Sequence, residues 1–172
     1  MNANQLINEI ERAFSGVARP ATSLRQFVLT DRFGMSGKIT KKQWEQAGRQ
    51  RGDSNWQDIS DAEIHECECL LAHMQAEAFQ YYLPAYMRYA VKHLHDQAES
   101  AEIVGSVVFS LTPFAKDPST FASMAEQLQL LNGSHKRVIV QLLNFIATAG
   151  YESHAADARA ALDGYWSDSG DA

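Results

Sequence analysis

Apolar residues recur three and four positions apart along most of the chain, which is the spacing that places them on one face of an α-helix. The clearest such segments are 4–14, 40–51, 60–74, 76–94, 118–131, 134–148 and 153–165. Residues 101–111 are rich in β-branched side chains, so their pattern fits either a strand or a helix. We therefore predict an all-α, single-domain bundle of roughly six to eight helices over residues 1–166, with a frayed tail at 167–172.

Short polar signals indicate where several of these helices begin and end. Thr40 is placed to cap a helix, and Ser60 followed three residues later by Glu63 is typical of a capping box. Residues 31–37 include two glycines and are predicted to form a loop. Pro84 lacks a backbone N–H, so it predicts a kink or a break in the long apolar helix around it.

The composition is that of an ordinary globular protein. The 172 residues are 45% hydrophobic and 21% charged, and the length corresponds to one domain. No uninterrupted apolar run approaches the roughly 20 residues that cross a bilayer, and the N-terminus lacks the basic and apolar regions of a signal peptide. We therefore expect a cytoplasmic protein without membrane association, in which Cys67 and Cys69 stay reduced.

The net charge of −6 is unevenly distributed. Residues 1–60 carry nine Lys/Arg and six Asp/Glu, residues 61–112 carry two and eight, and residues 113–172 carry four and seven. Because this acidic excess repels phosphate backbones, we expect no nucleic acid as a partner. The same field attracts a basic protein, although acidic side chains often serve only to keep a surface soluble.

Four carboxylates gather within eight residues, namely Asp61, Glu63, Glu66 and Glu68. Two of them lie near the predicted start of a helix, where the helix dipole favours negative charge. The cluster is therefore either a capped, solvated helix face or a docking surface for the lysines and arginines of a partner.

Tyrosines are concentrated in the segment 81–89, where Tyr82, Tyr86 and Tyr89 fall on one helical stripe. Such a stripe is typical of a core whose hydroxyl groups reach its edge. The alternative is a recognition surface, used either for a partner protein or for a homodimer.

His65, Cys69 and His73 are spaced four residues apart, so neighbouring pairs share a face if one helix carries them all. Cys69 with His65 or His73 supplies half of a zinc site, which makes a metal-binding protein or small metalloenzyme one alternative function. The two histidines are about 12 Å apart along such a helix, too far to hold one ion together. Buried cysteines and surface histidines explain the same residues, so we expect no metal and no cofactor. The sequence contains no Gly-x-Ser-x-Gly elbow and no Walker loop, and we predict no catalytic residues.

Two segments carry a resemblance to a known family. Residues 10–14 read Ile-Glu-Arg-Ala-Phe, and residues 79–86 read Phe-Gln-Tyr-Tyr-Leu-Pro-Ala-Tyr. Together they resemble a family of small bacterial helical proteins of uncharacterised function. The resemblance implies a bacterial cytosolic protein and transfers no catalytic residue. Small acidic helical proteins of this kind are often immunity proteins paired with secreted toxins.

We therefore expect a non-enzymatic protein that binds and inhibits another protein. The form that the acidic excess favours is a bacterial immunity protein that neutralises a cognate toxin, such as a basic nuclease, by direct contact. The predicted partner-binding residues are the carboxylates and tyrosines above: Asp61, Glu63, Glu66, Glu68, Tyr82, Tyr86 and Tyr89. A self-associating structural module is a further alternative, beside the metal-binding protein.

Overall fold

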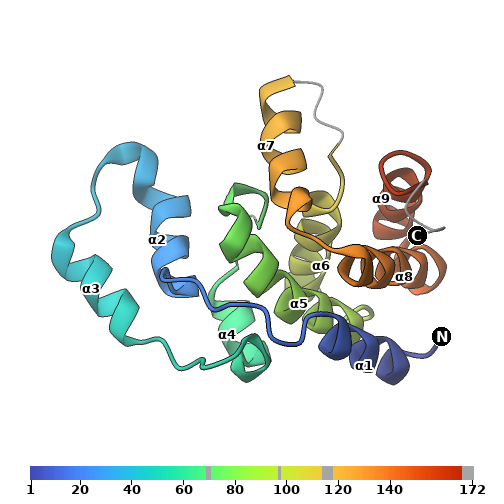
Figure 1. The fold of residues 1–172 in the computed structure, drawn as a ribbon, viewed down its shortest axis with the longest axis horizontal. Helices are drawn as coiled ribbons and strands as arrows, with labels where there is room; N and C mark the ends of the chain where they lie inside the picture. Colours follow the sequence, from blue (N-terminus) through green and yellow to red (C-terminus); the bar gives the residue numbers. More distant parts are fainter. Residues whose placement is uncertain (69–70, 97, 114–117, 168–172) are drawn as a thin grey trace.

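The computed structural model describes residues 1–68, 71–96, 98–113 and 118–167, and nine α-helices with three 3₁₀ turns form all the regular structure in these ranges (Figure 1). The helices are α1 (Ala3–Ala13), α2 (Leu24–Phe33), α3 (Lys41–Arg49), α4 (Asp61–Glu66), α5 (Ala76–Lys92), α6 (Ala98–Ser110), α7 (Pro118–Gln129), α8 (Gly133–Ala149) and α9 (Glu152–Asp163). The 3₁₀ turns are Gly34–Ser36, Trp56–Asp58 and Leu71–His73. The predicted all-α class is confirmed, and the undecided segment 101–111 is helical as part of α6, apart from its last residue. None of the described helices is long and apolar enough to cross a membrane.

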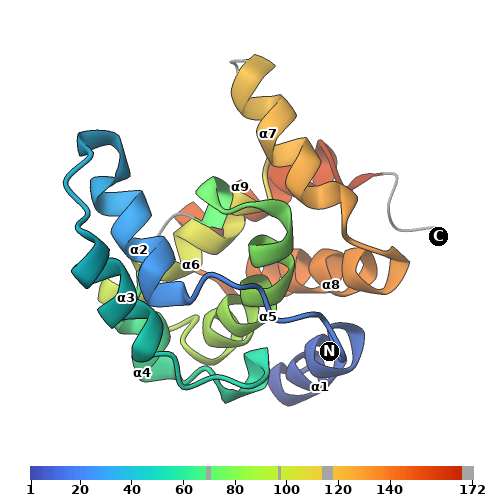
Figure 2. The same cartoon turned by 60° about the vertical axis from the view of Figure 1, so that its left-hand side comes forward.

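α5 is the central helix of the fold (Figures 1 and 2). Every residue from Tyr81 to Val91 is buried, as expected of a helix that is apolar on all sides. It packs against α1, α6, α7 and α8, which together close the core. The prediction of a helix break at Pro84 is wrong, because α5 runs through this residue without interruption. Packing on every side keeps the segment helical although the proline ring removes one backbone hydrogen bond.

Several helix ends follow their capping residues, and one does not. The Oγ atoms of Thr40 and Ser60 each accept a hydrogen bond from the third backbone N–H of the helix that they open, as predicted. The predicted helix over 60–74 is wrong beyond Glu66, where α4 ends. The carbonyl of Cys67 accepts a hydrogen bond from the buried Tyr86 hydroxyl at 2.6 Å. This tertiary bond fixes the chain where a continuing helix would have used the same carbonyl internally.

α2 and α3 form an arm at one edge of the molecule, seen on the left of Figures 1 and 2. α2 extends to Phe33, so the predicted loop 31–37 is wrong for its first three residues. The chain turns toward α3 at Gly37, whose φ of 63° lies in the left-handed region that favours glycine. Of the residues of α3, all of which the structure describes, Ala47 alone is buried. The arm is therefore held mainly through α2.

A buried ionic network fastens the segment between α3 and α4 to the central helix. Asp53 Oδ2 accepts hydrogen bonds from the Tyr81 hydroxyl at 2.7 Å and from Arg51 Nη2 at 2.9 Å, and Arg19 Nε donates to it at 3.2 Å. Burial alone would raise the pKa of Asp53, but the hydrogen bonds from Arg51 and Tyr81 outweigh it and lower this pKa. The network thus positions the chain where it leaves α3.

Candidate functional site

The predicted tyrosine surface lies in the core. Tyr82 and Tyr86 are 0% exposed and Tyr89 is 3% exposed. The Tyr82 hydroxyl donates to the carbonyl of Thr22 at 3.0 Å, and that of Tyr86 donates to Cys67. The assignment of these three tyrosines to a partner-binding surface is therefore corrected: they are packing residues. A homodimer built on their rings has no exposed aromatic face to use.

Asp61, the first of the predicted carboxylates, pairs with the end of α5. Its Oδ2 lies 3.1 Å from Lys92 Nζ and 3.2 Å from His93 Nε2. Burial would raise the pKa of Asp61, but the hydrogen bonds from Lys92 and His93 lower it below its ordinary value. This carboxylate therefore joins α4 to α5 and is already neutralised within the chain.

Arg25 on α2 gathers two more of these carboxylates. Its Nη2 lies 2.6 Å from Glu66 Oε2, and its Nε lies 4.0 Å from Glu63 Oε1. Burial raises the pKa of Glu63, although the charge of Arg25 opposes the rise. Glu68 differs from the other three because its carboxylate has no ion-pair partner among the described residues. Of the predicted acidic face, Glu68 is the member whose charge the described part of the chain leaves uncompensated.

The two histidines of the predicted metal site lie on different elements. Because α4 ends at Glu66, His65 and His73 do not share one helix. His73 Nδ1 lies instead 2.6 Å from Asp31 Oδ1 on α2. Cys69 lies outside the described residues. Within those residues, no group of three or more His, Cys, Asp or Glu side chains could hold a metal ion.

An acidic groove of about 500 Å³ lies between α2 and α6. Its lining consists of Asp31, Arg32, Glu68, Glu102, Gly105, Ser106 and Phe109. Three carboxylates and one guanidinium thus face the groove, and Asp31 alone of the three has an ion-pair partner in the described chain. The ring of Phe109 on the α6 wall is 53% exposed. The acidic groove therefore combines negative charge with an accessible apolar side chain.

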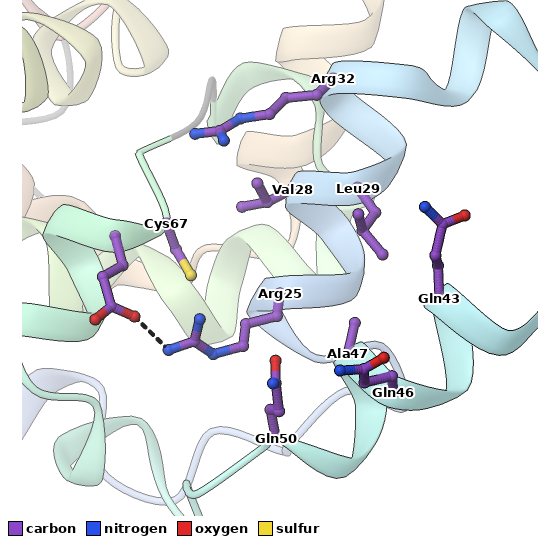
Figure 3. Close-up of a pocket in the computed structure, with 10 residues that line it drawn as sticks. Arg25, Val28, Leu29, Arg32, Gln43, Gln46, Ala47, Gln50 and Cys67 are labelled. Carbon is purple, nitrogen blue, oxygen red and sulfur yellow. Dashed lines mark hydrogen bonds and ion pairs between the residues drawn. The ribbon is translucent and has the colours of Figure 1, made fainter. Parts of the chain in front are cut away.

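A second cavity, the arginine–glutamine pocket, lies between α2, α3 and the end of α4 (Figure 3). It has a volume of about 310 Å³. Its lining consists of Arg25, Val28, Leu29, Arg32, Gln43, Gln46, Ala47, Gln50, Glu66 and Cys67. The lining residues of α2 and of α3 both follow the spacing i, i+3, i+4, i+7, so one face of each helix forms a wall.

The two arginines of this pocket differ in their surroundings. Figure 3 shows their guanidinium groups at two ends of the α2 wall, with Val28 and Cys67 between them. Arg25 is paired with Glu66, whereas the one side-chain hydrogen bond that Arg32 makes to a described residue is a long one of 3.4 Å to the carbonyl of Glu68. Burial raises the pKa of the Cys67 thiol to about 11, so this side chain is neutral at pH 7.

The comparison with known proteins places the chain in a family. A family model described as "Family of unknown function (DUF6714)" matches residues 2–169. The chain belongs to this family. No curated protein and no solved structure matches the chain. DUF6714 membership agrees with the expected family of uncharacterised function, and it assigns no role to any residue.

Sequence reasoning missed both cavities of this DUF6714 protein. The arginine–glutamine pocket has a signal that could have revealed it, because residues 25 and 32 and residues 43 and 50 are polar pairs seven positions apart, each with an apolar residue at the fifth position of its segment. The acidic groove has no such signal. Glu102 and Phe109 lie far along the chain from Asp31 and Glu68, and only the tertiary fold brings them together at one groove.

Proposed function

We propose that this DUF6714 protein is a non-enzymatic binding protein that captures a basic segment of another protein in the acidic groove. The observation that carries the proposal is the pairing of uncompensated carboxylates with the exposed ring of Phe109 in one groove. Complementary charge speeds encounter and selects partners, while a buried aromatic contact contributes affinity.

The lining suggests what the bound segment contains. Glu68 and Glu102 suit a lysine or an arginine, because neither carboxylate has an ion-pair partner among the described residues. Asp31 contributes less, since it is already bonded to His73. Phe109 suits an aliphatic or aromatic side chain next to those cations. A basic segment with an interspersed apolar residue meets all of these requirements.

The partner that we favour is a protein toxin, such as a basic nuclease, which this chain would neutralise as an immunity protein. The net charge of −6 supports this choice, since an acidic inhibitor attracts a basic toxin over a distance. Inhibitors of this kind act by covering a surface and need no catalytic group of their own.

The test compares two variants with equal net charge. Glu68→Lys/Glu102→Lys reverses charge inside the acidic groove, and Glu11→Lys/Asp157→Lys makes the same change at exposed residues of α1 and α9. Binding is measured by biolayer interferometry against the purified basic protein encoded beside this gene. The groove variant should bind at least about tenfold more weakly, whereas the control should lose no more than about threefold.

Two results would count against the proposal. Equal losses in both variants would mean that net charge alone, and not the groove, attracts the partner. A neighbouring protein with no toxic activity and no measurable binding would remove the immunity role.

A further inference from the structure

The arginine–glutamine pocket carries a charge that nothing in the described chain neutralises. Arg32 lines this pocket and makes no ion pair within the described residues, and Figure 3 shows its guanidinium at the end of the α2 wall, past Val28 and Cys67 and pointing away from α3. A guanidinium group is the donor that most suits a carboxylate, because its N–H groups match both carboxylate oxygens. Arg25, at the other end, is already occupied by Glu66 at 2.6 Å. The pocket therefore has one position for an anionic group.

The middle of the pocket is apolar. Val28 is 8% exposed, Ala47 7% and Cys67 1%, and Leu29 is half-buried beside them. These side chains come from α2, α3 and the end of α4, so they form one floor under the cavity. A small inorganic anion would leave this floor without a contact, whereas a short hydrocarbon chain would cover it.

The α3 wall of the pocket carries glutamine side-chain amides. The side-chain amides of Gln46 and Gln50 make no hydrogen bond within the described chain, and Figure 3 shows both side chains on the side of α3 that faces Arg25. Gln43 differs, because its Oε1 accepts hydrogen bonds from the backbone and hydroxyl of Thr40. These two side-chain amides can bond to a polar group of a ligand or lie beside the end of a hydrocarbon chain.

We propose that the arginine–glutamine pocket binds a small monocarboxylate with a short apolar chain. Its carboxylate pairs with Arg32, and its chain lies over Val28, Leu29 and Ala47. The volume of about 310 Å³ is at the lower end of what ligand pockets have, which limits the ligand to a small molecule. The proposed ligand differs in charge from the basic segment proposed for the acidic groove, and the two sites share Arg32.

In the experiment, hexanoate is titrated into the full chain, and binding is monitored through the amide chemical shifts of the protein. Hexylammonium and hexanol are control ligands with the same hydrocarbon chain length. Hexylammonium carries a positive charge, and hexanol carries none. Hexanoate should give saturable shifts in α2 and α3 with a Kd of about 1 mM, as expected of so small a ligand. Hexylammonium should give no shifts in α3, which contributes no residue to the acidic groove, and hexanol should bind at least about tenfold more weakly than hexanoate.

Three surface variants separate the site from general charge. Arg32→Gln should weaken hexanoate binding at least about tenfold, and Arg32→Lys should restore part of it. Arg49→Gln removes the same charge from an α3 residue outside the pocket and should leave the affinity unchanged. Absence of saturable shifts in α2 and α3 would overturn the proposal. Equal effects of Arg32→Gln and Arg49→Gln, or equal binding of hexanol and hexanoate, would also overturn it.

Discussion

Replacing Asp53 by asparagine should destabilise the protein strongly, because it leaves a buried arginine without its counter-charge. The Asp53 side chain is 4% exposed and that of Arg51 is 8% exposed, so water cannot replace the lost carboxylate. Asp53 accepts hydrogen bonds from Arg51 at 2.9 Å and from the Tyr81 hydroxyl at 2.7 Å. Removal of one member of a buried pair typically costs about 3–5 kcal/mol.

The structure places Asp53→Asn at the lower end of this range, at about 3 kcal/mol, because part of the arginine stays satisfied. Arg51 Nη1 also donates to the carbonyls of Pro20 at 2.6 Å and Ala21 at 3.3 Å, and these bonds do not need the carboxylate. Tyr81→Phe removes one hydrogen bond to the carboxylate and keeps the ion pair, so it should cost about 1.5 kcal/mol. The asparagine would have nearly the volume of the Asp53 side chain, so no cavity adds to the cost of Asp53→Asn.

The assay is urea unfolding of the wild type and both variants, with the free energy of unfolding compared at several pH values. The folded pKa of Asp53 is lowered, so its stabilising effect is complete above the unfolded pKa of about 4 and is lost as pH falls through the folded value. The cost of Asp53→Asn should therefore be largest near pH 7 and shrink in acid. A cost below about 1 kcal/mol at pH 7, or a cost that does not change with pH, would refute this account of the network.

Three further predictions concern the core. Tyr86→Phe leaves the buried carbonyl of Cys67 without its donor and should lower the free energy of unfolding by about 1–3 kcal/mol, measured in urea. In a Cys69→Ser variant, Cys67 should react with a disulfide reagent at least about 100-fold more slowly than a free thiol, because its pKa is about 11 and it is buried. Fast labelling of the folded protein would contradict this expectation. Burial lowers the pKa of His135, which stacks on Phe14 at 4.2 Å, so stability should fall as pH drops below about 6.5, and His135→Gln should flatten this dependence.

Local signals in the sequence account for much of the fold. Thr40 and Ser60 cap helices because a side-chain oxygen and the backbone N–H groups next to it suffice for a cap. The path of the chain around Pro84 and Cys67 depends instead on distant residues. α5 stays helical at Pro84 because it is packed on all sides, and α4 ends where the Tyr86 hydroxyl meets the carbonyl of Cys67.

The candidate sites were harder to predict because charge and burial depend on partners far along the chain. Glu63 and Glu66 form an acidic face in the sequence, but Arg25 of α2 pairs with both and reduces its charge. Helical spacing alone does not tell whether the stripe with Tyr82 faces the core or the surface, since a buried stripe and an exposed stripe repeat with the same helical period. Glu68 lines the acidic groove, but its neighbours there come from α2 and α6, which the sequence does not place beside it.

Amide chemical-shift mapping with a short peptide of alternating lysine and leucine tests the capture of a basic segment most directly. The wild type should show saturable shifts at the end of α2 and along the outer face of α6, around Glu102 and Phe109, that weaken as salt is added. Glu68→Lys/Glu102→Lys should abolish them, while Glu11→Lys/Asp157→Lys should retain them. Shifts that spread over the whole surface, or that survive charge reversal in the groove, would contradict the proposed function.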